Sequence, residues 1–203
     1  AQSAGNKVYG TRITEGKFEL GYRGGLDTDS RSRLDMKHKH KLSVGYGITD
    51  FWWTELIGEL ERGGKDTDTF LYEATEWENR FELITETDYL PGFGLYTALV
   101  LAEKDGKAHK IEARALAEKR IGAMRHRFNL NFERETGGGR DHGLELGYAW
   151  QTKWYVLPEL AEDISLQPGF EAYGDFGPIN DFLSGAEQKH QLGPVALAEF
   201  GLG

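Results

Sequence analysis

The stretch that decides the fold reads MRHRFNLNFE and covers residues 124–133. Four of the five alternate positions from Met124 to Phe132 are apolar, and arginine, asparagine and glutamate occupy the positions between them. Successive side chains of a β-strand point to opposite faces, so this stretch predicts a strand with one oily and one polar face. A helix would instead need apolar residues three or four positions apart.

The same alternation recurs along the chain, for example at residues 15–22 and 144–151. It predicts ten strands, at residues 12–25, 32–48, 52–63, 68–84, 93–103, 108–119, 123–135, 142–154, 164–176 and 189–201. A helix competes only over 108–120, where Ala, Glu, Lys and Arg dominate, and there the neighbouring pattern favours a strand. We expect the 203 residues to form one domain, residues 1–203.

Two kinds of connection alternate between the predicted strands. Those that follow the odd-numbered strands are rich in Gly, Asp and Lys, as at 24–29 and 137–141, whereas most others are short and flanked by aromatic or apolar residues, as at 48–53. The longer connection at 155–163 is an exception. Outer-membrane barrels have short periplasmic turns and longer outer loops. We therefore predict an all-β, antiparallel up-and-down transmembrane β-barrel in the Gram-negative outer membrane, with a periplasmic N-terminus.

A soluble β-protein would show the same alternation with its oily face inward, so other features decide between the two. The predicted strands are longer than the roughly 5–6 residues typical of soluble strands. Aromatic residues gather near the short turns, as in an interfacial belt. They are Tyr46, Phe51, Trp52, Trp53, Tyr89, Phe93, Tyr96, Trp150, Trp154 and Tyr155. Charges of both signs share the polar face, which suits a lumen where each buried charge needs a partner.

These faces give the candidate functional residues. The predicted lumen-lining charges are Glu55, Glu59, Glu76, Glu78, Arg80, Glu82, Glu112, Arg114, Arg125, Arg127, Glu133, Glu145 and Glu171. The predicted lipid-facing residues are Phe18, Leu20, Tyr22, Phe128, Leu130, Phe132, Leu144, Leu146, Tyr148 and Trp150.

A resemblance supports this interpretation. Residues 167–178 (QPGFEAYGDFGP) and 188–195 (QKHQLGPV) are similar to the late strands of proteobacterial outer-membrane β-barrel proteins, and NLNFE at 129–133 shares that similarity. The family is poorly characterised and transporter- or porin-like, so the resemblance implies location and architecture but no catalytic motif. The chain ends in GLG rather than on an aromatic residue. Either the barrel closes at ten strands, or a C-terminal hairpin is missing, and we favour the missing hairpin, which would turn ten strands into twelve.

Composition excludes several other classes of protein. The net charge of -9 argues against a nucleic-acid partner. The chain has no cysteine, so it has neither a disulfide nor a thiolate metal site. No apolar run reaches the roughly 18 residues of a transmembrane helix. The opening AQSAGN reads equally as a mature end left by signal cleavage and as an arbitrary start.

Motifs for metal binding or catalysis are weak. Met36, His38 and His40 share a strand face, but they lack a third clear ligand, and a strand end that meets lipopolysaccharide or water explains them as well. Turn formation beside glycine explains the loop carboxylates better than calcium does. These are Asp27, Asp29, Asp66, Asp68, Asp105 and Asp141. Ser43 has no nucleophile motif around it, so we expect neither an enzyme, a metal nor a cofactor.

The expected function is a narrow porin-like channel with a charged lumen for ions or small solutes. Because Glu outnumbers Arg on the predicted inner face, weak cation preference is expected. The alternatives are a non-conducting structural or accessory barrel of a cell-envelope complex and a lipid-modifying outer-membrane enzyme. The expected partners are outer-membrane lipids, lipopolysaccharide and other envelope proteins.

Overall fold

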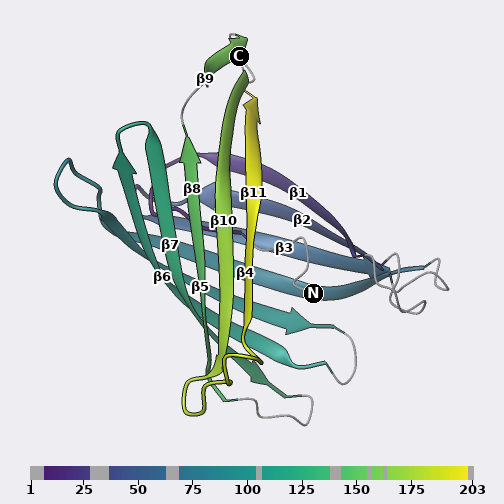
Figure 1. The fold of residues 1–203 in the computed structure, drawn as a ribbon. Helices are drawn as coiled ribbons and strands as arrows, with labels where there is room; N and C mark the ends of the chain where they lie inside the picture. The colour runs from purple at the N-terminus through teal and green to yellow at the C-terminus, as the bar shows by residue number, and fades with distance from the viewer. Residues whose placement is uncertain are drawn as a thin grey trace.

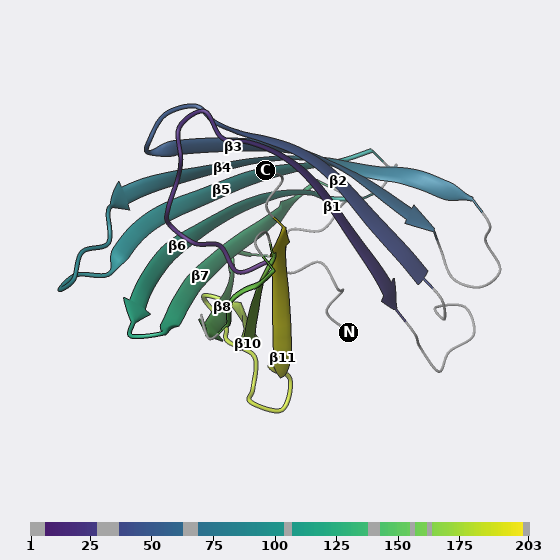
Figure 2. The ribbon, with the colours of Figure 1, turned by 90° about the horizontal axis from the view of Figure 1, so that it is seen from above.

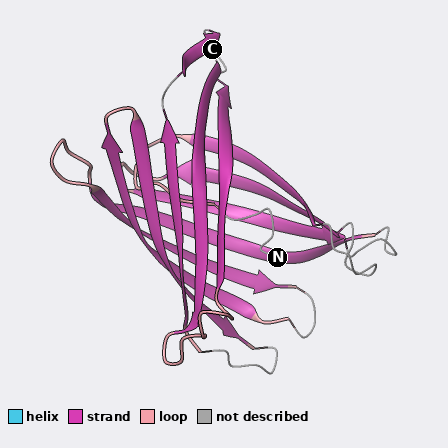
Figure 3. Cartoon of the chain, in the orientation of Figure 1, coloured by secondary structure: helices cyan, strands magenta, loops and turns pink. Residues whose placement is uncertain are grey.

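Strands make up nearly all of the regular structure of this chain. The computed structural model describes residues 7–27, 37–62, 69–103, 107–137, 143–154, 157–161 and 164–200. Its strands are β1 (Phe18–Asp27), β2 (Lys37–Gly47), β3 (Trp52–Arg62), β4 (Phe70–Ile84), β5 (Gly92–Ala102), β6 (His109–Ile121), β7 (Met124–Thr136), β8 (Glu145–Trp154), β9 (Leu157–Ala161), β10 (Ile164–Pro178) and β11 (Lys189–Phe200). Figure 3 shows no helix in this part of the chain. Within the same residues, no helix is long and apolar enough to cross a membrane.

Ten of the strands form one antiparallel meander (Figure 1), in the order β1-β2-β3-β4-β5-β6-β7-β8-β10-β11. Each strand of this path pairs with its neighbour in the chain, except that β8 pairs with β10. The predicted all-β, up-and-down architecture is therefore confirmed, and β6 replaces the competing helix at 108–120. The ten predicted ranges match within a few residues, apart from the first strand, and residues 32–36, 63, 68, 142 and 201 lie outside the described residues.

The sheet curls strongly, so that it has a concave and a convex face (Figure 2). The two edge strands of the meander are β1 and β11, and no pairing joins them within the described residues. Closure of a barrel, and the extra hairpin that would make twelve strands, therefore stay predictions.

The two faces carry side chains of opposite character. Along β3, the buried positions Trp53, Glu55 and Ile57 alternate with the exposed Leu56 and the half-buried Thr54. The register places Glu55 beside Glu78 of β4, so the polar rows of neighbouring strands lie side by side on one face. That face is the concave one, because its side chains contact a segment that runs inside the curve of the sheet.

This N-terminal segment, residues 7–17, differs from the structure predicted for it. The predicted first strand began at residue 12, but β1 begins at Phe18, and residues 12–17 are not in a strand. The N-terminal segment runs within the curve of the sheet (Figure 2). Val8, Tyr9, Thr11 and Ile13 are buried there.

Two smaller corrections concern the connection at 155–163 and the aromatic belt. The connection contains the short strand β9, which pairs with β10 off the main path. Trp53 and Tyr96 do not belong to an outer belt, because both are buried on the concave face. Trp53 packs against Gly45 of β2, where an added Cβ would overlap the indole ring. Tyr155 lies outside the described residues.

Candidate functional site

The candidate functional site is the charged concave face together with the N-terminal segment. None of the thirteen predicted lumen charges is exposed to solvent. Glu55, Glu76 and Glu78 are buried, at 6%, 6% and 2% exposure. The other ten are half-buried: Glu59, Arg80, Glu82, Glu112, Arg114, Arg125, Arg127, Glu133, Glu145 and Glu171. Such burial requires partners, because an unpaired charge away from water is costly.

Hydrogen bonds fix the N-terminal segment to strands that are far away in the sequence. The Tyr9 amide donates to Asn129 Oδ1 at 2.8 Å, and the Asn129 side-chain amide donates to the Tyr9 carbonyl at 2.9 Å. The Tyr9 hydroxyl donates to Glu78 Oε1 at 2.6 Å. Further toward the short turns, the Ile13 amide donates to Glu82 Oε2 at 3.1 Å. The segment is thus bound to both β4 and β7, across the curve of the sheet.

Aromatic and cationic groups surround Tyr9. Its ring lies 4.5 Å from the ring of Tyr96, centroid to centroid, and both rings are buried. The Arg114 guanidinium lies 5.2 Å from the Tyr9 ring and 4.7 Å from the Tyr96 ring, which suits cation–π attraction. The Arg80 guanidinium lies 5.8 Å from the centre of the same Tyr9 ring and 5.4 Å from the centre of the Trp53 ring. Tyr9 therefore fills the middle of the interior rather than leaving it open.

The segment approaches the sheet so closely that small residues are needed at the contacts. An added Cβ at Gly10 would overlap the Glu118 carboxylate and lie 2.8 Å from Arg127 Nε. Thr11 packs against Gly92 and Gly94 of β5, where added Cβ atoms would lie 2.8 and 3.4 Å from its side chain. The Glu118 carboxylate also accepts hydrogen bonds from Arg125 Nη1 at 3.0 Å and from Arg127 Nε at 2.6 Å. The N-terminal segment therefore packs closely against β5, β6 and β7 in the half of the interior nearest the short turns.

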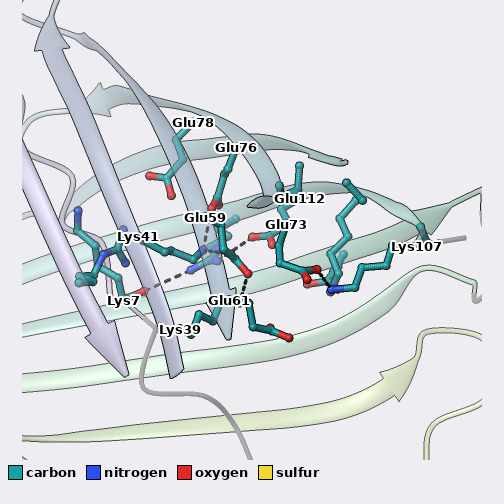
Figure 4. A pocket seen from close by; sticks show the side chains of 18 of the residues that line it. Lys7, Lys39, Lys41, Glu59, Glu61, Glu73, Glu76, Glu78, Lys107 and Glu112 are labelled. Atoms are coloured by element: carbon teal, nitrogen blue, oxygen red, sulfur yellow. Dashed lines mark hydrogen bonds and ion pairs between the residues drawn. The ribbon is translucent and has the colours of Figure 1, made fainter. Parts of the chain in front are cut away.

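A cavity of about 340 Å³ lies beside Tyr9, among side chains from the ends of β2, β3 and β4 that meet the long connections. Figure 4 shows how charged side chains of its lining lie. Seven acidic and seven basic side chains line it. They are Glu59, Glu61, Glu73, Glu76, Glu78, Glu112 and Glu133, with Lys7, Arg23, Lys39, Lys41, Lys107, Lys110 and Arg114. Lys7 and Tyr9 of the N-terminal segment belong to this lining, so the segment forms one wall of the cavity.

Most of these charges are paired with a side chain of opposite charge. Lys41 Nζ lies 2.8 Å from Glu76 Oε2 and 3.4 Å from Glu59 Oε2, which links β2 to β3 and β4. Lys39 Nζ lies 2.6 Å from Glu59 Oε1. Other pairs in this interior are Lys107 with Glu73, Lys110 with Glu133 at 2.6 Å, Arg114 with Glu112 at 2.7 Å and Lys7 with Glu55 at 3.9 Å. Paired side chains of this kind narrow an aqueous path without making it apolar.

Burial raises the pKa of the Tyr9 phenol well above its ordinary value, and the negative charge of Glu78 raises it further. The hydroxyl therefore stays protonated and remains a donor to Glu78 across the physiological pH range.

The ten predicted lipid-facing residues all lie on the opposite, convex face. Five of them are exposed, namely Phe18, Leu20, Tyr22, Phe128 and Leu144. The other five, Leu130, Phe132, Leu146, Tyr148 and Trp150, are half-buried. Other large apolar side chains of the same face are exposed as well, among them Leu42, Val44, Leu56, Trp77, Leu95 and Leu101.

Several important residues were absent from the predicted site. No sequence pattern indicated that the N-terminal segment with Tyr9 enters the interior. Glu118 and Asn129, by contrast, alternate in step with the predicted polar residues of β6 and β7, so the alternation could have identified them. Lys39 and Lys41 line the interior, although their neighbours His38 and His40 lie on the convex face, where the two imidazoles stack 6.0 Å apart. Within the described residues, no three His, Cys, Asp or Glu side chains could hold a metal ion. Met36, Asp29, Asp66, Asp68, Asp105 and Asp141, and the side chain of Asp27, lie outside the description.

No protein-family model matches this chain, and a search of curated proteins found no match. The resemblance to proteobacterial outer-membrane barrels therefore stays a prediction.

Replacing Tyr9 with Phe removes its hydrogen bond to the buried Glu78 carboxylate and leaves the ring in place. We expect the free energy of unfolding to fall by about 1 kcal/mol, the typical net contribution of a hydrogen bond, because the buried Glu78 carboxyl loses this donor. Urea unfolding in lipid vesicles, followed by tryptophan fluorescence, measures the change. Tyr148→Phe is the matched control, since that hydroxyl makes only an exposed contact of 3.3 Å with His190. Equal losses in the two variants would contradict a structural role for Tyr9.

Proposed function

We propose that this chain forms a β-barrel in the outer membrane of a Gram-negative bacterium, with a narrow, porin-like lumen. One observation carries the proposal: the sheet buries its carboxylates on the concave face and exposes its leucines and aromatic residues on the convex face. In a protein surrounded by water, the buried carboxylates and the exposed apolar side chains would both destabilise the folded state. A barrel in a bilayer requires this arrangement, since lipid meets the outer face and charges share the interior.

Strand length is consistent with a membrane span. The ten strands of the meander have 10–15 residues each, from β1 and β8 to β4 and β10. A tilted strand needs roughly 9–11 residues to cross the hydrocarbon layer. The short turns, such as 48–51 and 122–123, then lie in the periplasm, and the longer connections lie outside. Lipids and lipopolysaccharide are the partners that this orientation implies, and the net charge of -9 argues against a nucleic-acid partner.

The lumen of this proposed channel is constricted by the N-terminal segment. Ions would pass through the space between paired side chains and around Tyr9, so we expect small conductance and exclusion of large solutes. The weak cation preference expected from Glu and Arg alone is revised here. Lysines bring the lining of the cavity to seven acidic and seven basic groups, so we expect little preference between K⁺ and Cl⁻.

Single-channel recording in planar lipid bilayers tests this proposal with the purified wild-type chain. We expect small, discrete conductance steps and a reversal potential close to zero in a KCl gradient. Heat-modifiable migration on a gel, with the chain in the outer-membrane fraction, tests membrane location separately. A chain that stays in the soluble fraction overturns the membrane proposal as a whole.

A second candidate, a non-conducting structural barrel, is favoured by the dense hydrogen bonding of the N-terminal segment. Tyr9 is fixed by partners on β4 and β7, and the Gly10 carbonyl accepts a hydrogen bond from Arg80 at 3.4 Å. A permanently filled interior would conduct nothing. Silence of a correctly inserted wild-type chain, and of the deletion variant described in the Discussion, would decide for the structural role.

A further inference from the structure

A group of charged and aromatic side chains lies together on the convex face, beyond exposed apolar residues of the same strands. We define this convex cluster as Tyr22, His38, His40, Arg62 and Phe70, from strands β1 to β4. His38 pairs with Arg62 across β2 and β3, and Arg62 pairs with Phe70 across β3 and β4. The cluster lies at the ends of the strands that meet the long connections, which is the outer side in the proposed orientation.

The aromatic and imidazole rings of the cluster hold one another in place. The His40 ring lies 5.2 Å from Phe70 and 6.0 Å from His38, and its Nδ1 lies 2.7 Å from the Tyr22 hydroxyl. The Arg62 guanidinium lies 5.9 Å from the centre of the Phe70 ring. These contacts give the cluster a fixed shape before any ligand arrives, which lowers the entropy cost of binding.

Arg62 has no anionic partner within the described residues. The interior arginines Arg114 and Arg127 each lie within 2.7 Å of a carboxylate oxygen, whereas no carboxylate of the described ranges forms an ion pair with Arg62. Its Nε is buried and makes no hydrogen bond to the described part of the chain. An arginine on a lipid-facing surface is costly unless it meets a polar partner at the membrane interface. The phosphate or carboxylate group of a ligand at this interface would supply such a partner.

The order of side chains below the cluster indicates what kind of molecule carries that anion. On β2 the convex row runs from His38 and His40 through Leu42 and Val44, so polar groups give way to exposed apolar ones toward the short turns. The neighbouring rows repeat this order, with Arg62 above Leu56 on β3 and Tyr22 above Leu20 on β1. A surface that is cationic at its outer end and oily below it matches a lipid with an anionic headgroup.

We infer that the convex cluster binds a phosphate group of an outer-leaflet lipid, the phosphorylated sugar headgroup of lipid A, with its acyl chains over Leu42 and Val44. The guanidinium fork of Arg62 offers paired N–H donors that match phosphate oxygens, and the two imidazoles and the Tyr22 hydroxyl add further polar contacts. This inference rests on the proposed membrane location, but it does not depend on whether the lumen conducts.

Binding of purified lipid A to the wild-type chain in neutral detergent micelles tests this site. Arg62→Gln should weaken lipid A binding about fivefold or more, the effect expected for losing one arginine at a charged lipid surface. Arg62→Lys should recover part of the affinity. His190→Gln is the matched control, because His190 also lies beside a tyrosine hydroxyl on the convex face but has no arginine in its cluster. Lipid A stripped of its phosphates should bind the wild-type chain as weakly as the intact lipid binds the Arg62→Gln variant.

Equal binding of lipid A to the wild-type chain and to Arg62→Gln would overturn the inference. Displacement of lipid A by millimolar inorganic phosphate alone would also overturn it, since the site would then bind free phosphate rather than lipid. Flotation of each variant with neutral phosphatidylcholine vesicles separates this failure from failure of the proposed function. A wild-type chain that does not float contradicts the membrane proposal. Normal flotation without Arg62-dependent binding contradicts only the lipid site.

Discussion

Deleting residues 1–14 is expected to raise the single-channel conductance about threefold or more, because conductance through a narrow pore depends on its tightest constriction. The deletion removes Tyr9, whose ring packs 4.5 Å from Tyr96 in the middle of the interior, and Thr11, which fills the space beside Gly92 and Gly94. It leaves Glu15 and Lys17, next to the start of β1, in place. Planar-bilayer recording at fixed KCl concentration measures the change.

Deletion of residues 1–6 alone is the matched control for this experiment. All described contacts of the N-terminal segment begin at Lys7, whose carbonyl accepts a hydrogen bond from Arg114 at 3.3 Å. The shorter deletion keeps Tyr9 and Thr11 in place, so we expect it to change conductance much less than the 1–14 deletion does. Heat-modifiable migration of both variants establishes that each one is inserted and folded. Equal conductance of a folded 1–14 deletion and the wild-type chain would show that the N-terminal segment is not the constriction.

Alternation predicted the strands well because the two faces of each strand meet environments of opposite polarity. The predicted strand 123–135 became β7, Met124–Thr136, and the ambiguous 108–120 became β6. In the latter, helix-favouring residues form a strand because Leu116 and Glu118 are both buried on the concave face against neighbouring elements. Cross-strand packing here outweighs intrinsic propensity.

The N-terminal segment was not predictable, because its contacts are distant in the sequence. Tyr9 binds Glu78 and Asn129, which lie 69 and 120 residues away, and no local pattern encodes such partners. Glu15 and Lys17 also continue the polar row of β1, so the sequence extends the strand past its true start at Phe18.

The misplacement of Trp53 and Tyr96 had a different cause. They were assigned to a belt by their closeness to short turns, although Trp53 shares its parity with Glu55, and Tyr96 pairs with Arg80 across β4 and β5. Parity along the strand was the better guide, since side chains of one parity share one face.

Replacing Leu56 with Arg is expected to lower the free energy of unfolding in phospholipid vesicles by about 2–4 kcal/mol, the cost of a cation near the bilayer midplane of an outer-membrane barrel. Leu56 lies in the middle of β3, it is 56% exposed, and it faces outward beside Val44 and Trp77. In a soluble protein, an exposed leucine replaced by arginine changes stability by only about ±0.5 kcal/mol. The size of the effect therefore reports whether lipid or water contacts the convex face.

Leu90→Arg is the matched control, because Leu90 has nearly the same exposed fraction, 58%, but lies in the connection between β4 and β5. Near the membrane interface the same change should cost only about 0–1 kcal/mol. Urea titration of both variants in vesicles, monitored by tryptophan fluorescence, measures the difference. If both substitutions are nearly neutral, water rather than lipid surrounds Leu56. The exposed leucines and buried carboxylates would then need an explanation other than a membrane, such as a protein partner that covers the convex face.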